Sequence, residues 1–161
     1  MSDIDAAMAS LPLVEYPAGH TLLHQDEKVA SIYILKSGKV RVEKDGTEVA
    51  ISPDPDAVFG EMSTILEMDH SASVHCLTDA VFYHIEDPRV TLKKYPELLW
   101  HIARLLCLRL FNLNQYLVDL KSQFEGHDHL GMVDEVLETL MNQQRTNVLK
   151  RAVSKRDTGG Y

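Results

Sequence analysis

The apolar residues of this chain follow two different periods, and the change between them limits the fold more than any other feature. Residues 13–86 hold short apolar or alternating stretches, with turn signals roughly every eight to twelve residues, as in a β-sandwich or β-barrel. From Pro96 to Phe124 the apolar residues recur instead at steps of three and four, which indicates a helix. The sequence therefore predicts a β domain followed by a long helix.

Two neighbouring stretches show how the β domain should be built. Residues 31–35 are almost all apolar, as in a strand that is covered on both faces. Val40 and Val42 alternate with polar residues, so one face of their strand should point inward. Further along the chain, residues 72–76 alternate in the same way and residues 81–85 form the last expected strand.

A hairpin is expected between these stretches. Asp45 and Gly46 are the kind of pair that closes a two-residue turn, because both residues tolerate a positive φ. Val49 and Ile51 should continue the inward face on the returning strand. Residues 52–56 contain two prolines and are expected to form a loop, because proline has no N–H for a strand ladder.

The long helix carries two sets of apolar residues. The first set has coiled-coil-like spacing and consists of Leu99, Ile102, Leu106, Leu110, Leu113, Leu117 and Leu120. The second set, Leu98, Leu105 and Leu108, lies off this seam and is expected to pack on the β domain. A helix with two apolar faces needs two partners, so we expect the first set to pair with a second copy of the chain. The alternative is one broad apolar face on one large core.

The chain is expected to have four segments. They are a β domain with an N-terminal helix (1–94), the dimerisation helix (95–125), a short amphipathic helix (126–145) and a basic, disordered tail (146–161). The formal net charge is −8, and the acidic body disfavours contact with nucleic acid. Only 16 residues follow the short helix, too few for a DNA-recognition helix and its wing. We therefore expect no direct DNA binding.

Composition argues against several other classes of protein. No apolar run approaches the roughly 20 residues of a membrane helix, and the acidic start lacks the pattern of a secretory signal. Cys76 and Cys107 are too few for a disulfide scaffold and are expected as core residues of a cytoplasmic protein. The eight histidines lack the spacing of a metal site, and no nucleophile motif or carboxylate pair is present. We expect neither a metal nor catalysis.

The stretch FGEMSTILEMDHSASV, residues 59–74, is the candidate ligand site. Gly60 permits close approach of the backbone before a short helix at residues 61–66. The first N–H groups of such a helix are unpaired and can face an anion. Glu61 can accept hydrogen bonds from a ribose hydroxyl, although an acidic residue at a helix N-terminus also has a purely structural explanation.

These residues resemble the cyclic nucleotide-binding domain, the effector domain of the catabolite activator and of cyclic-nucleotide-dependent kinases and channels. The resemblance includes YPAG at 16–19 and YILKSGKVRV at 33–42 and runs to about residue 85. It implies a mainly β jelly-roll (double-stranded β-helix) sandwich with flanking helices and a long C-terminal dimerisation helix. It also implies a role in regulation and signal transduction, with cyclic AMP or cyclic GMP as the ligand. The implied ligand-binding residues are Phe59, Gly60, Glu61, Met62, His70, Ser71 and Ala72.

Two positions depart from the family's pattern. An arginine that clasps the cyclic phosphate follows the family's glutamate by about nine residues, and here that position is His70. A histidine has fewer donors than a guanidinium and, because its unperturbed pKa is about 6.5, is mostly neutral at pH 7. Asp26 stands where the family usually has glycine, and aspartate is one of the few residues that tolerate a left-handed turn.

Two interpretations of function stay open. In the first, the chain is a ligand-sensing regulatory module with weak or altered nucleotide binding, which dimerises through its long helix and signals to a protein effector. In the second, it is a degenerate module of the same fold that serves only dimerisation or protein–protein interaction.

Overall fold

The computed structural model describes residues 2–123, 134–136 and 138, and the chain divides into two compact units, 1–103 and 104–161. Of the predicted amphipathic helix at 126–145, only residues 134–136 and 138 are described. The predicted tail lies wholly outside the described residues. The boundaries of the four predicted segments stay predictions. Among the described helices, none has the length and hydropathy of a membrane span.

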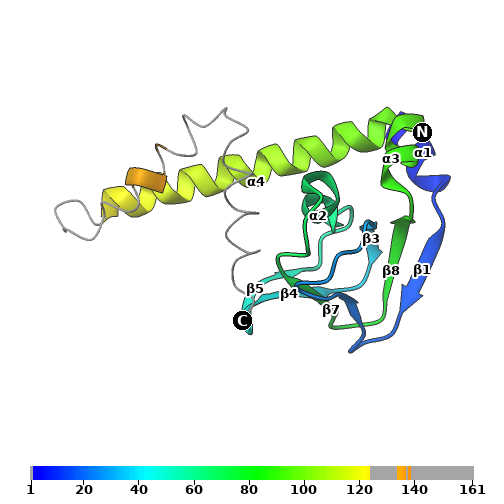
Figure 1. Ribbon diagram of the computed structural model, residues 1–161, viewed down its shortest axis with the longest axis horizontal. Helices are drawn as coiled ribbons and strands as arrows, with labels where there is room; N and C mark the ends of the chain where they lie inside the picture. The colour runs from blue at the N-terminus through cyan, green and yellow to red at the C-terminus, as the bar shows by residue number, and fades with distance from the viewer. Residues whose placement is uncertain (1, 124–133, 137, 139–161) are drawn as a thin grey trace, which may run out of the picture. The chain divides into compact units, whose positions relative to one another are not determined.

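The first unit is an antiparallel β-sandwich (Figure 1). One sheet has the order β1-β8-β3-β6 and the other β2-β7-β4-β5. The strands are β1 (Leu13–Tyr16), β2 (Thr21–Leu23), β3 (Ile32–Ser37), β4 (Val40–Lys44), β5 (Thr47–Ser52), β6 (Val58–Phe59), β7 (Ser73–Cys76) and β8 (Ala80–Ile85). These two sheets, which share one buried core, confirm the predicted β-sandwich. Each sheet combines strands from both halves of the domain.

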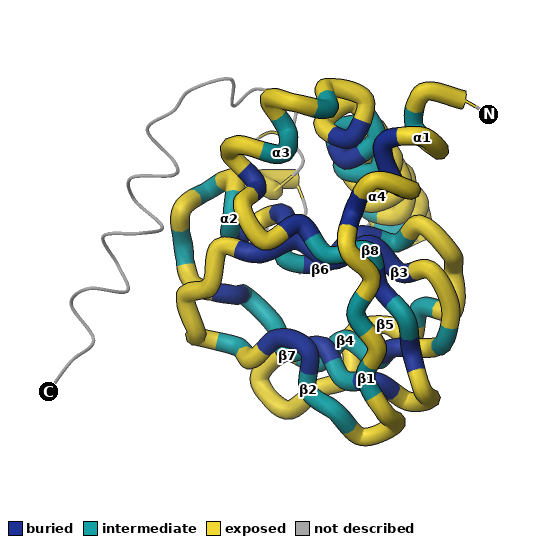
Figure 2. The backbone as a smooth tube through the Cα atoms, turned by 90° about the vertical axis from the view of Figure 1, so that its right-hand side faces the viewer, coloured by how far each residue is buried: buried dark blue, intermediate teal, exposed yellow. Residues whose placement is uncertain are grey.

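Inward-facing side chains of both sheets form the core of the sandwich. Leu35 and Phe82 of one sheet and Val40, Val74 and Cys76 of the other belong to one buried cluster. Figure 2 shows the corresponding buried segments on the two layers of strands. Strand β3 is buried on both faces, as its apolar sequence predicted, because its alternate residues Ile32 and Ile34 are also fully buried.

Helices precede and follow the strands of the sandwich in the chain. Helix α1 (Asp3–Ala9) has a capping box between Ser2 and Asp5, and α3 (Pro88–Lys94) has Asp87 as its N-cap. Both lie near the start of α4 (Pro96–Gln123) in Figures 1 and 2. Leu98 and Ile102 of α4 are buried, whereas Leu108, which was expected to pack on the β domain together with Leu98, is 47% exposed.

The prediction for the returning strand of the hairpin was wrong. The turn forms at Asp45 and Gly46, both with positive φ, but Val49 and Ile51 are exposed. A register shift between β4 and β5 places Ile51 opposite Arg41, on the outward side of the strand, while Val40 and Val42 point inward. The alternation of residues along β5 did not show which of its two sets of alternate side chains faces the core.

One cysteine also differs from expectation. Cys76 is buried as predicted, whereas Cys107 of α4 is exposed. A leucine-rich helix has polar and apolar faces, and composition alone does not place one cysteine on either of them.

Candidate functional site

The candidate site begins where β6 passes into the short helix α2 (Glu61–Leu66), the helix predicted from sequence. Gly60 lies between them with φ +85°, in the left-handed region. A Cβ atom at this position would lie 2.4 Å from the carbonyl oxygen of Ser31. The glycine is therefore required both by its backbone conformation and by the close approach of the 31 backbone.

The residues around Gly60 have different environments. Phe59 pairs with Tyr33 in the first sheet and belongs to the sandwich core. Glu61, at the first position of α2, is only 4% exposed, whereas Met62 is largely exposed. The structure thus places Phe59 as a core residue, and Glu61 is the polar residue of this turn that is held inside the fold.

His70 is buried, with 3% of its surface exposed, although it follows α2 in a loop. Its Nδ1 lies 2.7 Å from the hydroxyl of Ser63, which comes from α2. The same hydroxyl lies 3.1 Å from the carbonyl oxygen of Gly60 and donates to it. Nε2 of His70 is buried and has no hydrogen-bond partner within the described residues. His70, Ser63 and Gly60 therefore form one connected polar group beneath the short helix.

A neighbouring loop holds His70 in place through the backbone. The N–H of Asp26 donates to the carbonyl of His70 at 2.9 Å, and the N–H of His70 donates to the carbonyl of Glu27 at 2.9 Å. Asp26 has φ +67°, so the left-handed turn predicted at this position is confirmed. The N–H of Gln25 donates to the hydroxyl of Ser73 at 2.9 Å, which fixes the same loop to the start of β7.

Ser71 and Ala72 link His70 to β7 and are half-buried. The chain from Gly60 to Ser73 therefore closes into a loop whose two ends are anchored, one beside Ser31 and the other beside Gln25. Of the implied contact residues, the structure brings Gly60 and His70 together through Ser63.

Burial sets the electrostatics of His70. Desolvation lowers the pKa of its imidazole below the usual 6.5, and the carboxylates of Glu27 and Asp69 oppose this effect without reversing it. Both nearby charges are negative, and the imidazole itself is neutral at pH 7. The position at which the family has a permanent cation is therefore uncharged in this protein.

The lowered pKa gives a prediction about stability. A histidine that is harder to protonate in the folded state stabilises the fold at high pH, and that stability is lost as pH falls through the unfolded value near 6.5. We expect the free energy of unfolding to fall between about pH 7.5 and 5.5. His70→Gln should show a weaker fall, as measured by urea unfolding at several pH values. His101→Gln, at a histidine without this burial, is the control; equal slopes in all three proteins would contradict the prediction.

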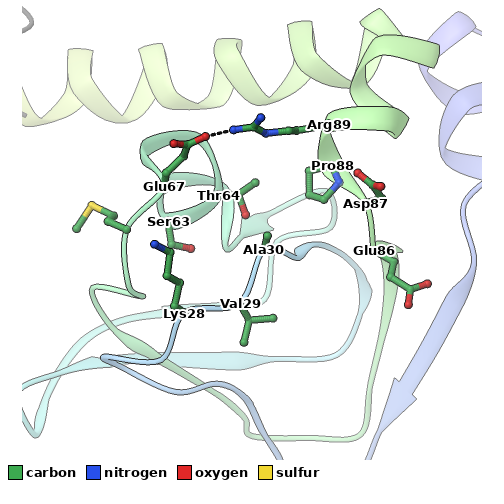
Figure 3. Close-up of a pocket in the computed structure, with 11 residues that line it drawn as sticks. Lys28, Val29, Ala30, Ser63, Thr64, Glu67, Glu86, Asp87, Pro88 and Arg89 are labelled. Carbon is green, nitrogen blue, oxygen red and sulfur yellow. Dashed lines mark ion pairs between the residues drawn. The ribbon is translucent and has the colours of Figure 1, made fainter.

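A cavity of about 690 Å³ borders α2 (Figure 3). Lys28, Ser63 and Thr64 are among the residues that line it, together with residues 86–89. Arg89 of α3 forms an ion pair with Glu67 at the end of α2, drawn as a dashed line in Figure 3. This exposed pair connects the end of α2 to α3, and Ser63 both lines the cavity and contacts His70.

Sequence reasoning did not identify Ser63 as part of the site. Its position in α2, three residues after Gly60, lets the hydroxyl reach back to the glycine carbonyl. The contact with His70 depends on how the loop after α2 returns, which no local pattern encodes. Among the described residues, no group of three potential metal ligands is present.

Comparison with known proteins agrees with this architecture. The family described as "Cyclic nucleotide-binding domain" matches residues 13–91, which span the sandwich and the site just described. The chain belongs to this family, and it carries a regulatory domain of the cyclic nucleotide-binding type.

Two curated relatives have names that refer to cyclic AMP. The chain is 31% identical over 125 residues to the CRP-like cAMP-activated global transcriptional regulator of Mycobacterium tuberculosis, covering 74% of this chain and 56% of the relative. It is 29% identical over 114 residues to the cyclic AMP receptor protein of Thermus thermophilus, covering 67% and 53%. The chain thus spans about half the length of these relatives.

A solved structure shows the same fold over more of the chain. The crystal structure of the Thermus thermophilus catabolite activator protein matches with a TM-score of 0.60 at 22% identity, over 96% of this chain and 84% of that chain. At this identity the likeness establishes the sandwich and the long helix.

Proposed function

We propose that the chain is a ligand-sensing regulatory module whose long helix forms a homodimer. Its candidate ligand site, residues 59–74 (the cassette), binds nucleotides in an altered way. The observation that carries this proposal is the intact backbone of the cassette. Gly60 keeps its left-handed conformation against Ser31, Glu61 is buried, and the loop that carries His70 is anchored by two backbone hydrogen bonds.

In this proposal, Glu61 contacts the sugar, while the backbone of Gly60 and Met62 with Ser71 and Ala72 surrounds the position next to His70. We leave Phe59 out, because it packs in the core. His70 replaces the family's charged phosphate contact with a neutral and buried one. Binding of cyclic AMP or cyclic GMP should therefore be weak.

The homodimer is proposed from the surface of α4. Leu110 and Leu113 are each close to half exposed in the single chain, and Leu106, Leu117 and Leu120 are partly covered. Exposed leucines in a row on one helix favour burial against a partner. Ile102 is 1% exposed in the single chain, so it does not belong to the proposed dimer surface. A protein effector that reads the ligand state completes the proposal.

Calorimetric titration of cyclic AMP and cyclic GMP into the native protein and into His70→Arg tests the ligand site. We expect the arginine variant to bind on the order of a hundredfold more tightly, because a guanidinium adds charged, bidentate hydrogen bonds to phosphate. The native protein should bind more tightly at pH 6 than at pH 8, because phosphate favours the protonated imidazole.

His24→Arg is the matched control, since it adds the same charge at an exposed histidine on the neighbouring loop. An equal gain from both variants would mean a general charge effect. No binding by either the native protein or His70→Arg would favour the alternative function, a degenerate module that serves dimerisation or protein–protein interaction.

A further inference from the structure

The cavity beside α2 lies at one end of three neighbouring strands of the first sheet. Strand β3 begins where β8 and β6 end, because it is antiparallel to both, and Ile32 at its start pairs with Ile85. Residues 28–30 lead toward β3, α2 follows β6, and residues 86–89 follow β8. The topology of the sheet therefore brings these three segments together around the cavity, and all of them lie in the first unit.

Five charged side chains line this cavity, and three of them already have a partner. Arg89 forms the ion pair with Glu67, and the carboxylate of Asp87 caps the N-terminus of α3. The side chains of Lys28 and Glu86 form no hydrogen bond or ion pair with any residue that the structure describes. The cavity therefore presents one cation and one anion that a ligand can bind.

These two charges lie on different sides of the cavity. In Figure 3, Lys28 lies on the side of α2, Glu86 lies on the side of β8, and Val29 and Ala30 lie between them. Val29 is 47% exposed, and the buried Pro88 adds a further apolar surface to the lining. A complementary ligand has a carboxylate at one end, an ammonium at the other end and apolar groups in the middle.

The size of the cavity distinguishes between ligands of this kind. A free amino acid carries both charges on one carbon atom, so it cannot place them on opposite sides. At about 690 Å³, the cavity lies within the range of about 300–1,000 Å³ that is usual for small-molecule sites. An extended peptide of three residues is about 10 Å long. At pH 7 both of its termini are charged, because their ordinary pKa values are about 8 and about 3.5.

We propose that this cavity binds a short linear peptide of apolar residues, with its free carboxylate at Lys28 and its free ammonium at Glu86. The site is distinct from the nucleotide contacts of the proposed function, and this inference does not depend on them. Ser63 lines the cavity and also contacts His70. A bound peptide therefore lies against the same helix that carries the polar group of the cassette.

The first test compares forms of one peptide that differ only in charge. The tripeptide Ala-Val-Ala is titrated into the full chain by calorimetry at pH 7, unmodified, with an acetylated amino terminus, and with an amidated carboxyl terminus. We expect saturable binding of the unmodified peptide and about a fivefold loss of affinity for each modification, the effect of one partly exposed ion pair. Free valine should bind more weakly than the peptide.

Three results would overturn this inference. They are the absence of saturable binding by the unmodified peptide, equal affinities of its three forms, and tighter binding of valine than of the peptide. None of them bears on the proposed function, because the cyclic nucleotide titrations test that site separately.

Two variants test the orientation of the peptide. Lys28→Gln should bind the unmodified and the amidated peptide equally, because the carboxylate has lost its partner, and should still respond to acetylation. Glu86→Gln should respond to amidation and not to acetylation. Lys44→Gln and Glu48→Gln remove the same charges at exposed positions that do not line the cavity, and should behave as the native protein does. If the two cavity variants respond to both modifications, or show the opposite pattern, the assigned contacts are wrong.

Discussion

Replacing Gly60 with alanine should lower the free energy of unfolding by about 3 kcal/mol or more. The left-handed backbone, with φ +85°, disfavours any Cβ by about 1–2 kcal/mol. The new Cβ would also lie 2.4 Å from the Ser31 carbonyl oxygen, so one of the two backbone segments must move. The shift displaces α2 and Ser63, and ligand binding should be lost together with stability. Urea unfolding followed by circular dichroism measures the change.

Gly19→Ala provides a matched control for this prediction. Gly19 has nearly the same φ, +86°, but a Cβ there would meet nothing within 4 Å. Its replacement should cost only the backbone term of about 1–2 kcal/mol and leave ligand binding unchanged. If the two variants lose the same stability, the close approach of the 31 backbone at Gly60 does not have the effect inferred from the structure.

Leu113→Glu should convert the proposed homodimer into monomers. Leu113 is 47% exposed in the single chain, and burying two glutamates against each other in a dimer should weaken association by about three orders of magnitude. The first unit should keep its stability, because the substitution lies outside it. Sedimentation velocity over a range of concentrations gives the association constant of both proteins.

Two further variants separate dimerisation from folding. Asn112→Glu places the same charge beside Leu113 on an exposed, polar position and should leave association unchanged. Ile102→Ala should instead lower the free energy of unfolding by about 3 kcal/mol, because its side chain is 1% exposed in the single chain. A native protein that sediments as a monomer at all concentrations would contradict the homodimer.

The sandwich was predictable because local signals agreed with one another. The apolar run of β3, the Asp-Gly hairpin and the glycine before α2 each encode one local geometry, and the structure shows all three. The face of β5 was not predictable, because it depends on a register shift between β4 and β5 that leaves no mark in the alternation. Ile102 follows the seam spacing but is already buried in the single chain, and spacing alone does not reveal which residues of a seam are free for a partner.

The candidate site was predictable only in part. The spacing from Glu61 identified His70. The resemblance to the family then indicated that His70 stands where the family has an arginine. His70 and Ser63 are seven residues apart in the sequence. The path of the loop between them determines both the burial of His70 and its contact with Ser63. The lowered pKa and the unpartnered Nε2 arise from that burial, so no sequence pattern indicated them.

The edge strand β5 affects how the protein behaves in solution. It presents six residues with a single charge, Glu48, no proline, and the exposed apolar side chains Val49 and Ile51. Such an edge can template intermolecular strand pairing, the first step of aggregation. The net charge of −8 opposes such strand pairing between molecules by electrostatic repulsion. Salt shortens the range of that repulsion to about 8 Å at physiological ionic strength, so colloidal stability in concentrated solutions depends on low ionic strength.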